Sequence, residues 1–323
     1  MIDGFGREID YLRISITDRC NLRCRYCMPE HGVAVMRHDD ILRYEEILRI
    51  VRIMRGMGVC HLRVTGGEPM ARRGCLDFVR ELRGISGIES VSMTSNGLLL
   101  CDRVQEAKEA GLTGLNLSLD TLDPDIYAEL TRGGDVRKAL RTLTQAIDAG
   151  ISTKVNAVPI RDRSEDAVVS LALLAKDCPV CVRFIELMPI GCARTLRPIP
   201  QKEIAERLTE AFGALSPDTA PHGHGPACYV KPQGFCGSIG FISALTHEFC
   251  DSCNRVRLTA DGQLKLCLNR SDGLDLRALL RGGADDKAIE REILEAIARK
   301  PERHAFNETI RGREARRMNE IGG

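Results

Sequence analysis

The chain has 323 residues, of which 43% are hydrophobic and 28% charged, and this composition excludes a disordered or fibrous protein. Lys and Arg number 46 against 45 Asp and Glu, so the chain lacks the bulk positive field that non-specific nucleic-acid binding requires. No apolar run reaches the ~18 to 20 residues of a membrane span, and the N-terminus has no apolar signal core. We therefore expect a cytoplasmic protein that binds neither nucleic acid nor membranes.

The first two hundred residues alternate β-rich runs with amphipathic helical stretches, a pattern typical of a parallel sheet with crossover helices. The expected strands are Tyr11 to Thr17, Cys60 to Thr65, Ser90 to Thr94, Thr113 to Leu119, Ser152 to Pro159 and Val182 to Leu187. The expected helices are Tyr44 to Met57, Cys75 to Arg83, Asp102 to Ala110, Val136 to Ala149, Ser164 to Lys176 and Gln201 to Phe212. Six such units predict an α/β fold, a partial and open (βα)6 barrel of the TIM type.

A second, smaller unit is predicted after the barrel. Gly, Pro and His crowd residues 216–226, which reads as a linker or loop between domains. The short alternating runs that follow predict a small antiparallel sheet with a hairpin at Ala260 to Gly262, and then two helices. The runs lie around Tyr229 and at Ser238 to Ile242, Arg255 to Thr259 and Gln263 to Leu266, and the helices at Leu274 to Leu280 and Asp286 to Arg299. We expect a barrel over 1–215, a small α+β domain over 216–305 and a tail over 306–323.

The predicted strands carry polar residues on the face that barrels usually fill with branched apolar side chains. With a period of two, Arg13, Ser15 and Thr17 share one face of the first strand. The same alternation recurs at Arg63 and Thr65, at Ser92, Thr94 and Asn96, at Asn116, Ser118 and Asp120, and at Ser152, Lys154 and Asn156. The alternative is a polar face that simply lies in water. Three inward cations would be costly to bury unpaired, so the pattern predicts a small phosphorylated polyanion inside the barrel.

Fourteen cysteines in a reducing compartment favour metal ligands or redox groups over a disulfide framework. Cys20, Cys24 and Cys27 follow the first strand, and three thiolates on one loop can hold three irons of a 4Fe-4S cluster and leave the fourth iron open. A second set of three, Cys250, Cys253 and Cys267, spans the predicted hairpin. Zinc is the alternative metal, but each set is one ligand short of a tetrahedral site. The other cysteines, Cys178 and Cys181 among them, read as buried thiols.

At Cys24-Arg25-Tyr26-Cys27 the sequence resembles the radical S-adenosylmethionine superfamily, and Thr65-Gly66-Gly67-Glu68-Pro69 is similar to the superfamily's glycine-rich element. Glycines at such an element permit close approach of the backbone to a ligand. Within the superfamily the whole chain closely resembles the GTP 3′,8-cyclase family, which acts first in molybdenum cofactor biosynthesis. The further matching segments are Ser118 to Pro124, Arg183 to Pro189, Cys253 to Thr259 and Ile321 to Gly323.

The resemblance implies a set of site residues. Cys20, Cys24 and Cys27 would hold one 4Fe-4S cluster, and Cys250, Cys253 and Cys267 a second one whose open iron faces guanine. The implied contacts to S-adenosylmethionine are Tyr26, Gly67, Ser118 and Met188. The implied contacts to GTP are Arg13, Arg63, Thr94, Lys154 and Arg255, with Arg257 as a further candidate. The expected catalytic residues are Arg13, Gly322 and Gly323, because in the family the two terminal glycines reach into the active site.

The resemblance also implies the reaction. Reductive cleavage of S-adenosylmethionine gives a 5′-deoxyadenosyl radical that removes the 3′ hydrogen of GTP, and the C3′ radical attacks C8 of guanine. The product would be (8S)-3′,8-cyclo-7,8-dihydroguanosine 5′-triphosphate. The implied partners are a reductant, a downstream cyclic pyranopterin monophosphate synthase and a second copy of the chain in a homodimer. The alternatives are a radical S-adenosylmethionine peptide maturase with an auxiliary cluster and a non-catalytic iron-sulfur or zinc protein.

Overall fold

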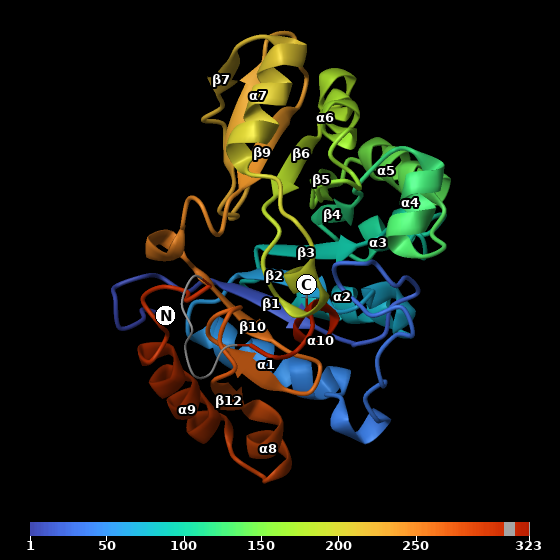
Figure 1. Cartoon of the computed structure of the whole chain (residues 1–323). Helices are drawn as coiled ribbons and strands as arrows, with labels where there is room; N and C mark the ends of the chain where they lie inside the picture. The colour runs from blue at the N-terminus through green and yellow to red at the C-terminus, as the bar shows by residue number, and fades with distance from the viewer. Residues whose placement is uncertain (307–313, 323) are drawn as a thin grey trace.

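The computed structural model describes residues 1–306 and 314–322, which form one mixed sheet with helices packed against it (Figure 1). The strands are β1 (Tyr11–Ser15), β2 (His61–Thr65), β3 (Ser90–Ser95), β4 (Gly114–Ser118), β5 (Ser152–Ala157), β6 (Cys181–Ile185), β7 (Leu215–Pro217), β8 (Cys228–Pro232), β9 (Ser238–Ile242), β10 (Arg255–Leu258), β11 (Gln263–Lys265) and β12 (Gly273–Asp275). Their order is β12-β11-β10-β1-β2-β3-β4-β5-β6-β9-β8-β7. Within the described residues the outer strands β12 and β7 do not pair with each other, so the sheet is open.

The helices lie between the strands in the chain and after the last of them. They are α1 (Tyr44–Gly56), α2 (Cys75–Gly84), α3 (Val104–Glu109), α4 (Pro124–Thr131), α5 (Val136–Asp148), α6 (Ala167–Asp177), α7 (Gln201–Phe212), α8 (Leu276–Arg281), α9 (Asp286–Ala298) and α10 (Met318–Ile321). Short 3-10 turns are η1 (His38–Asp40), η2 (Pro69–Ala71), η3 (Gly191–Thr195) and η4 (Cys250–Ser252). None of the helices in the described part of the chain is both long and apolar enough to cross a membrane.

The six predicted parallel strands are present as β1 to β6, and the α/β prediction is confirmed. The prediction of a separate antiparallel sheet is wrong. β9 pairs parallel with β6, and β10 pairs parallel with β1, so these strands extend opposite edges of the same sheet. The predicted hairpin is present between β10 and β11, where Leu258 faces Leu264. A short run of alternating polar and apolar residues identifies a strand but does not show which strand it pairs with. For this reason the sequence pattern led to the prediction of a separate sheet. The division at residue 215 stays a prediction.

The stretch over 216–226 is not a free linker. Its first residues belong to β7, which pairs with β8. The following residues then fold against the amino-terminal ends of the central strands, where the Lys154 ammonium donates to the carbonyl of His222. The His224 ring stacks on His61 with 3.4 Å between ring centroids. The high content of Gly, Pro and His correctly predicted irregular backbone. This segment packs against the sheet, however, and is not a free linker between domains.

The apolar faces of the strands form the core beneath the helices. Leu12, Ile14, Leu62 and Val64 are fully buried in a cluster with the inward residues of α1 and α2. Burying one such side chain contributes roughly 1.5–3 kcal/mol relative to leaving it exposed. Because strand side chains alternate, packing these residues under the helices turns the polar residues between them toward the other face of the sheet.

Candidate active site

A cavity of about 310 Å³ lies on the polar face of the sheet, where residues of β1 to β6 and β10 line it together with both sets of three cysteines. The predicted site residues that line this cavity are Arg13, Cys20, Cys24, Tyr26, Cys27, Arg63, Gly67, Thr94, Ser118, Met188, Cys250, Cys253, Arg255, Arg257 and Cys267. Lys154 and Gly322 are outside that lining, and Gly323 falls outside the described residues. The structure therefore brings together side chains that the chain spreads over about 255 positions.

Cations stand side by side across the sheet in this cavity. The register places Arg257 of β10, Arg13 of β1 and Arg63 of β2 next to one another. Burial, then the charges of Arg257 and Arg63, hold the pKa of Arg13 well below its ordinary value. Burial, then Arg255, lower the pKa of Arg257 to about 10. Like charges packed this closely favour any anion that enters between them.

Arg183 of β6 is a cation that the sequence analysis did not nominate. Its side chain is almost fully buried, with 2% exposed, and lines the same cavity. Its Nε donates to Asn156 Oδ1 at 2.8 Å, and its Nη2 donates to Asn116 Oδ1. The same period of two that identified Arg13 would have placed Arg183 inward had it been applied to the sixth strand.

Tyr11 is a second residue that the sequence analysis missed. The guanidinium carbons of Arg63 and Arg255 lie 5.4 Å and 5.5 Å from its ring centroid, within cation–π range. The phenol thus orients two of the predicted GTP contacts. The available signal was that Tyr11 shares a strand face with Arg13.

Lys154 lies near this cluster but is engaged elsewhere. Its Nζ donates to the His222 carbonyl of the covering stretch. Burial, then the charges of Arg183 and Arg63, lower the pKa of Lys154 to about 8. The cost of burying this ammonium is thus offset in part by a backbone acceptor.

The first set of cysteines lies on the loop after β1. The Cys20 sulfur accepts from the backbone N–H of Leu22 at 3.4 Å and from Asn96 Nδ2 at 3.8 Å. Burial raises the pKa of Cys20 to about 11, and burial with the nearby Cys20 raises the pKa of Cys27 to about 12. Three partly buried thiols, which would repel one another as thiolates, fit a site in which bound iron supplies the positive charge.

The second set lies at both ends of the β10–β11 hairpin. Burial raises the pKa of Cys250. Burial would raise the pKa of Cys253 as well, but the Lys300 ammonium and nearby donors lower it. Lys300 is itself fixed by donating to the Leu266 carbonyl at 2.6 Å. The thiolate form of Cys253 is favoured in this way, and the other two cysteines of the set are nearby. This arrangement fits an iron-sulfur site on this side of the cavity.

The predicted S-adenosylmethionine contacts lie beside the first set. The Tyr26 hydroxyl donates to Asp120 Oδ2 at 3.0 Å, and Asp120 Oδ1 accepts from the Val158 N–H at 2.8 Å. Burial raises the pKa of Asp120 to about 6. At Gly67 a β-carbon would lie 2.4 Å from the carbonyl oxygen of Arg19, so only glycine fits this turn.

The end of the chain packs onto the cavity. The carbonyl of Gly322 accepts from Arg257 Nη1 at 3.0 Å, and a β-carbon at Gly322 would lie 2.8 Å from Cβ of Ser15. Its φ of 77° is also in the left-handed region that favours glycine. Met318 and Asn319 of α10 line the cavity. A catalytic role for the terminal glycines stays a prediction.

Replacing Glu314 with glutamine should lower the free energy of unfolding by about 2 kcal/mol, because it leaves the buried ammonium of Lys265 without its counter-charge. Lys265 and Glu314 form an ion pair whose side chains are 0% and 2% exposed. Urea unfolding of the purified protein measures the change. The matched control is Glu290→Gln on α9, which should change the free energy by less than about 0.5 kcal/mol. An unchanged midpoint in Glu314→Gln would show that this pair does not anchor the C-terminal segment.

Comparison with known proteins supplies the context for this geometry. A model of the radical SAM superfamily matches residues 14–175, and a model described as Molybdenum Cofactor Synthesis C matches residues 180–306. The chain is 48% identical to GTP 3′,8-cyclase of Pelotomaculum thermopropionicum over 327 residues and 41% identical to GTP 3′,8-cyclase of Clostridium perfringens strain 13 over 323 residues, with 100% of each chain covered. Among solved structures, SuiB of Streptococcus suis bound to S-adenosylmethionine has a similar fold, with a TM-score of 0.62, 14% identity and coverage of 93% of this chain and 74% of SuiB.

Proposed function

This chain belongs to the GTP 3′,8-cyclase family of the radical SAM superfamily, and on that premise we propose that it cyclises GTP to (8S)-3′,8-cyclo-7,8-dihydroguanosine 5′-triphosphate in molybdenum cofactor biosynthesis. One observation supports the substrate more than any other. Two separate sets of three cysteines face a single cavity, and arginines from adjacent strands line it between them. A nucleoside triphosphate carries the negative charge that this arrangement favours.

The arginines would hold the triphosphate. Arg257, Arg13 and Arg63 each present a planar guanidinium group, and such groups bind phosphate oxygens through paired hydrogen bonds. Arg183 extends this surface toward β5 and β6, where Asn156 fixes its direction. The buried hydroxyl of Thr94 has no hydrogen-bond partner within the described residues, and it supports a polar ligand atom at this position.

The cofactors in this proposal are two 4Fe-4S clusters and S-adenosylmethionine. A cluster held by Cys20, Cys24 and Cys27 would supply the electron for reductive cleavage of S-adenosylmethionine, and one held by Cys250, Cys253 and Cys267 would bind and orient guanine. The chain's own part is to hold the reacting groups in contact and to exclude water. Apolar side chains serve the second task, since Ile185, Leu187 and Ile242 line the cavity together with Phe249 and Leu266.

The partners complete the proposal. The reaction needs a reductant, and its product would pass to a cyclic pyranopterin monophosphate synthase. We also propose a homodimer and a cytoplasmic location, the latter because all fourteen cysteines are free thiols and cluster ligands must remain reduced.

The test is an anaerobic incubation of the reconstituted protein with S-adenosylmethionine, dithionite and GTP, with ATP as the control nucleotide. We expect 5′-deoxyadenosine and the cyclised nucleotide with GTP and no cyclised nucleotide with ATP, both followed by mass spectrometry. If 5′-deoxyadenosine forms without a cyclised nucleotide, the superfamily assignment stands and GTP is not the substrate. A peptide substrate then becomes the leading alternative.

A further inference from the structure

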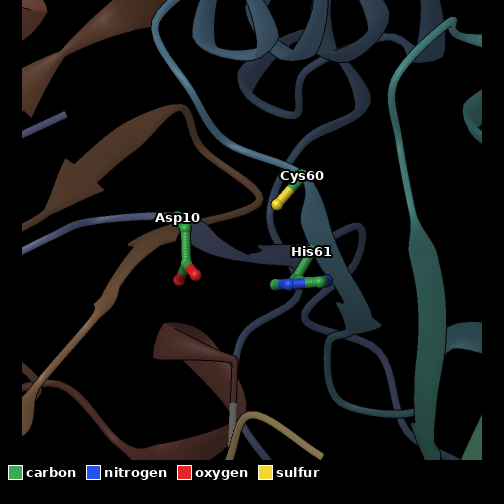
Figure 2. Close-up of side chains that lie close together, drawn as sticks. All are labelled: Asp10, Cys60 and His61. Carbon is green, nitrogen blue, oxygen red and sulfur yellow. The ribbon is translucent and has the colours of Figure 1, made fainter.

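Three potential metal ligands meet at the amino-terminal ends of β1 and β2, the opposite end of these strands from Cys20, Cys24 and Cys27. They are Asp10, Cys60 and His61, whose ligand atoms all lie within 4.8 Å of one another. Figure 2 shows the three side chains beside the starts of the two strands. None of them lines the active-site cavity. The group therefore lies outside the cavity, and Asn254, the residue after Cys253, is the neighbour that connects it to the second set of cysteines.

The sheet itself fixes the spacing of these residues. The carbonyl of Asp10 accepts from the backbone N–H groups of Cys60 at 3.0 Å and of His61 at 3.1 Å. The carbonyl of Cys60 in turn accepts from the N–H of Glu89 at 2.9 Å, just before β3. Four residues with metal-binding side chains are thus held together by backbone hydrogen bonds. A site on such rigid elements is preorganised, so binding costs little ordering of the chain.

The hydrogen bonds of the side chains leave the ligand atoms available. His61 Nδ1 lies 3.0 Å from the Ser90 hydroxyl, while His61 Nε2 lies 3.7 Å from Glu89 Oε2. Asp10 Oδ1 accepts from Asn254 Nδ2 at 2.8 Å, which leaves Oδ2. A histidine whose second nitrogen is held by a neighbour, and a carboxylate fixed by an amide, are the outer contacts typical of metal sites.

We propose that Asp10, Cys60 and His61 bind one zinc ion and that Glu89, whose Oε2 lies 3.7 Å from His61 Nε2, supplies the fourth ligand. One sulfur, one imidazole nitrogen and two carboxylate oxygens make a four-ligand set that zinc accepts in tetrahedral geometry. Asp10, Cys60 and Glu89 also place three potential negative charges in a small volume, and a divalent cation offsets their repulsion.

The zinc ion would have a structural role. Asp10 precedes β1, Cys60 directly precedes β2, His61 begins β2 and Glu89 precedes β3, so one ion would join the beginnings of three adjacent strands. Because Asp10 accepts a hydrogen bond from Asn254, the ion would also be linked to the start of β10, whose Arg255 and Arg257 line the active site. The proposal concerns binding only, and it does not depend on the substrate of the enzyme.

The experiment uses the protein with its iron-sulfur clusters reconstituted. Zinc sulfate is added anaerobically, loosely bound metal is removed by gel filtration, and zinc and iron are measured by mass spectrometry. X-ray absorption at the zinc edge then reports the ligands. We expect one zinc per chain, with one sulfur at about 2.3 Å and three nitrogen or oxygen ligands at about 2.0–2.2 Å. The iron content should not change.

Two variants make the test specific. Cys60→Ser should remove the sulfur from the zinc spectrum and lower zinc affinity at least tenfold. Glu89→Gln, at an exposed side chain whose loss does not threaten folding, should lower affinity about tenfold. The matched control is Cys236→Ser, an exposed free cysteine of the β8–β9 connection, which should bind zinc like the parent. Zinc with three sulfur ligands would place the ion in a cluster site and overturn the proposal. Equal zinc content in the parent and both variants would overturn it as well.

Discussion

Replacing Arg13 with methionine should lower kcat/KM for GTP by a factor of about 10² to 10³, which corresponds to a loss of about 3–4 kcal/mol of transition-state binding. Arg13 stands between Arg257 and Arg63 in the sheet register and is the centre of the cationic surface. Removing its guanidinium leaves a gap in the row that would bind the triphosphate. Steady-state formation of the cyclised nucleotide measures the effect.

The same replacement should raise the thermal stability of the protein without substrate. Burial and the two neighbouring arginines already oppose the charge of Arg13, so an apolar side chain of similar length relieves that repulsion. A gain in stability with a loss of activity distinguishes a binding cation from a structural one. The control is Arg49→Met on α1, whose ion pair with Asp286 is exposed, and which should leave both quantities nearly unchanged. A loss of activity accompanied by lower stability would mean that Arg13 mainly supports the fold.

Replacing Cys24 with serine should abolish both 5′-deoxyadenosine and the cyclised nucleotide. Cys24 belongs to the set beside Tyr26 and Gly67, and the loss of one ligand from a three-thiolate cluster removes the electron source of the reaction. The iron content should fall from about eight to about four atoms per chain, since each cluster holds four. Iron analysis and product formation are measured on the same preparation.

Replacing Cys253 with serine should give a different result. Cys253 lies on the opposite side of the cavity, beside Lys300 and Arg255. Iron should again fall by about half, and the cyclised nucleotide should be lost, but 5′-deoxyadenosine should still form because the first site is intact. Cys101→Ser is the control, because Cys101 does not line the cavity. Normal cyclisation by Cys253→Ser would show that the second set does not orient the substrate.

The sequence predicted the strands β1 to β6 because each one is a short β-rich run between amphipathic helical stretches, and five of the six also showed a period of two. The strand pattern also predicted Arg13, Arg63 and Lys154 as inward cations, and the structure places Arg13 and Arg63 in the cavity lining but Lys154 outside it. Arg183 could have been found by the same rule. The pairing of β10 with β1 could not, because it joins residues that no local pattern connects. The meeting of Asp10 with Cys60 escaped for the same reason, since sheet register alone brings them together.

The pairing of β10 with β1 also has a consequence for how the protein is made. Tyr11 faces Arg255 in this pairing, so nearly the whole chain must leave the ribosome before the two strands can meet. Contacts between residues this distant in the chain form late and slow the folding of a domain. Until β10 docks, the first-strand edge is unpaired and the second cysteine set has no fixed position. We therefore expect the clusters to be loaded after the chain has been synthesised, because β10 is the last strand of the cavity to pair with the sheet.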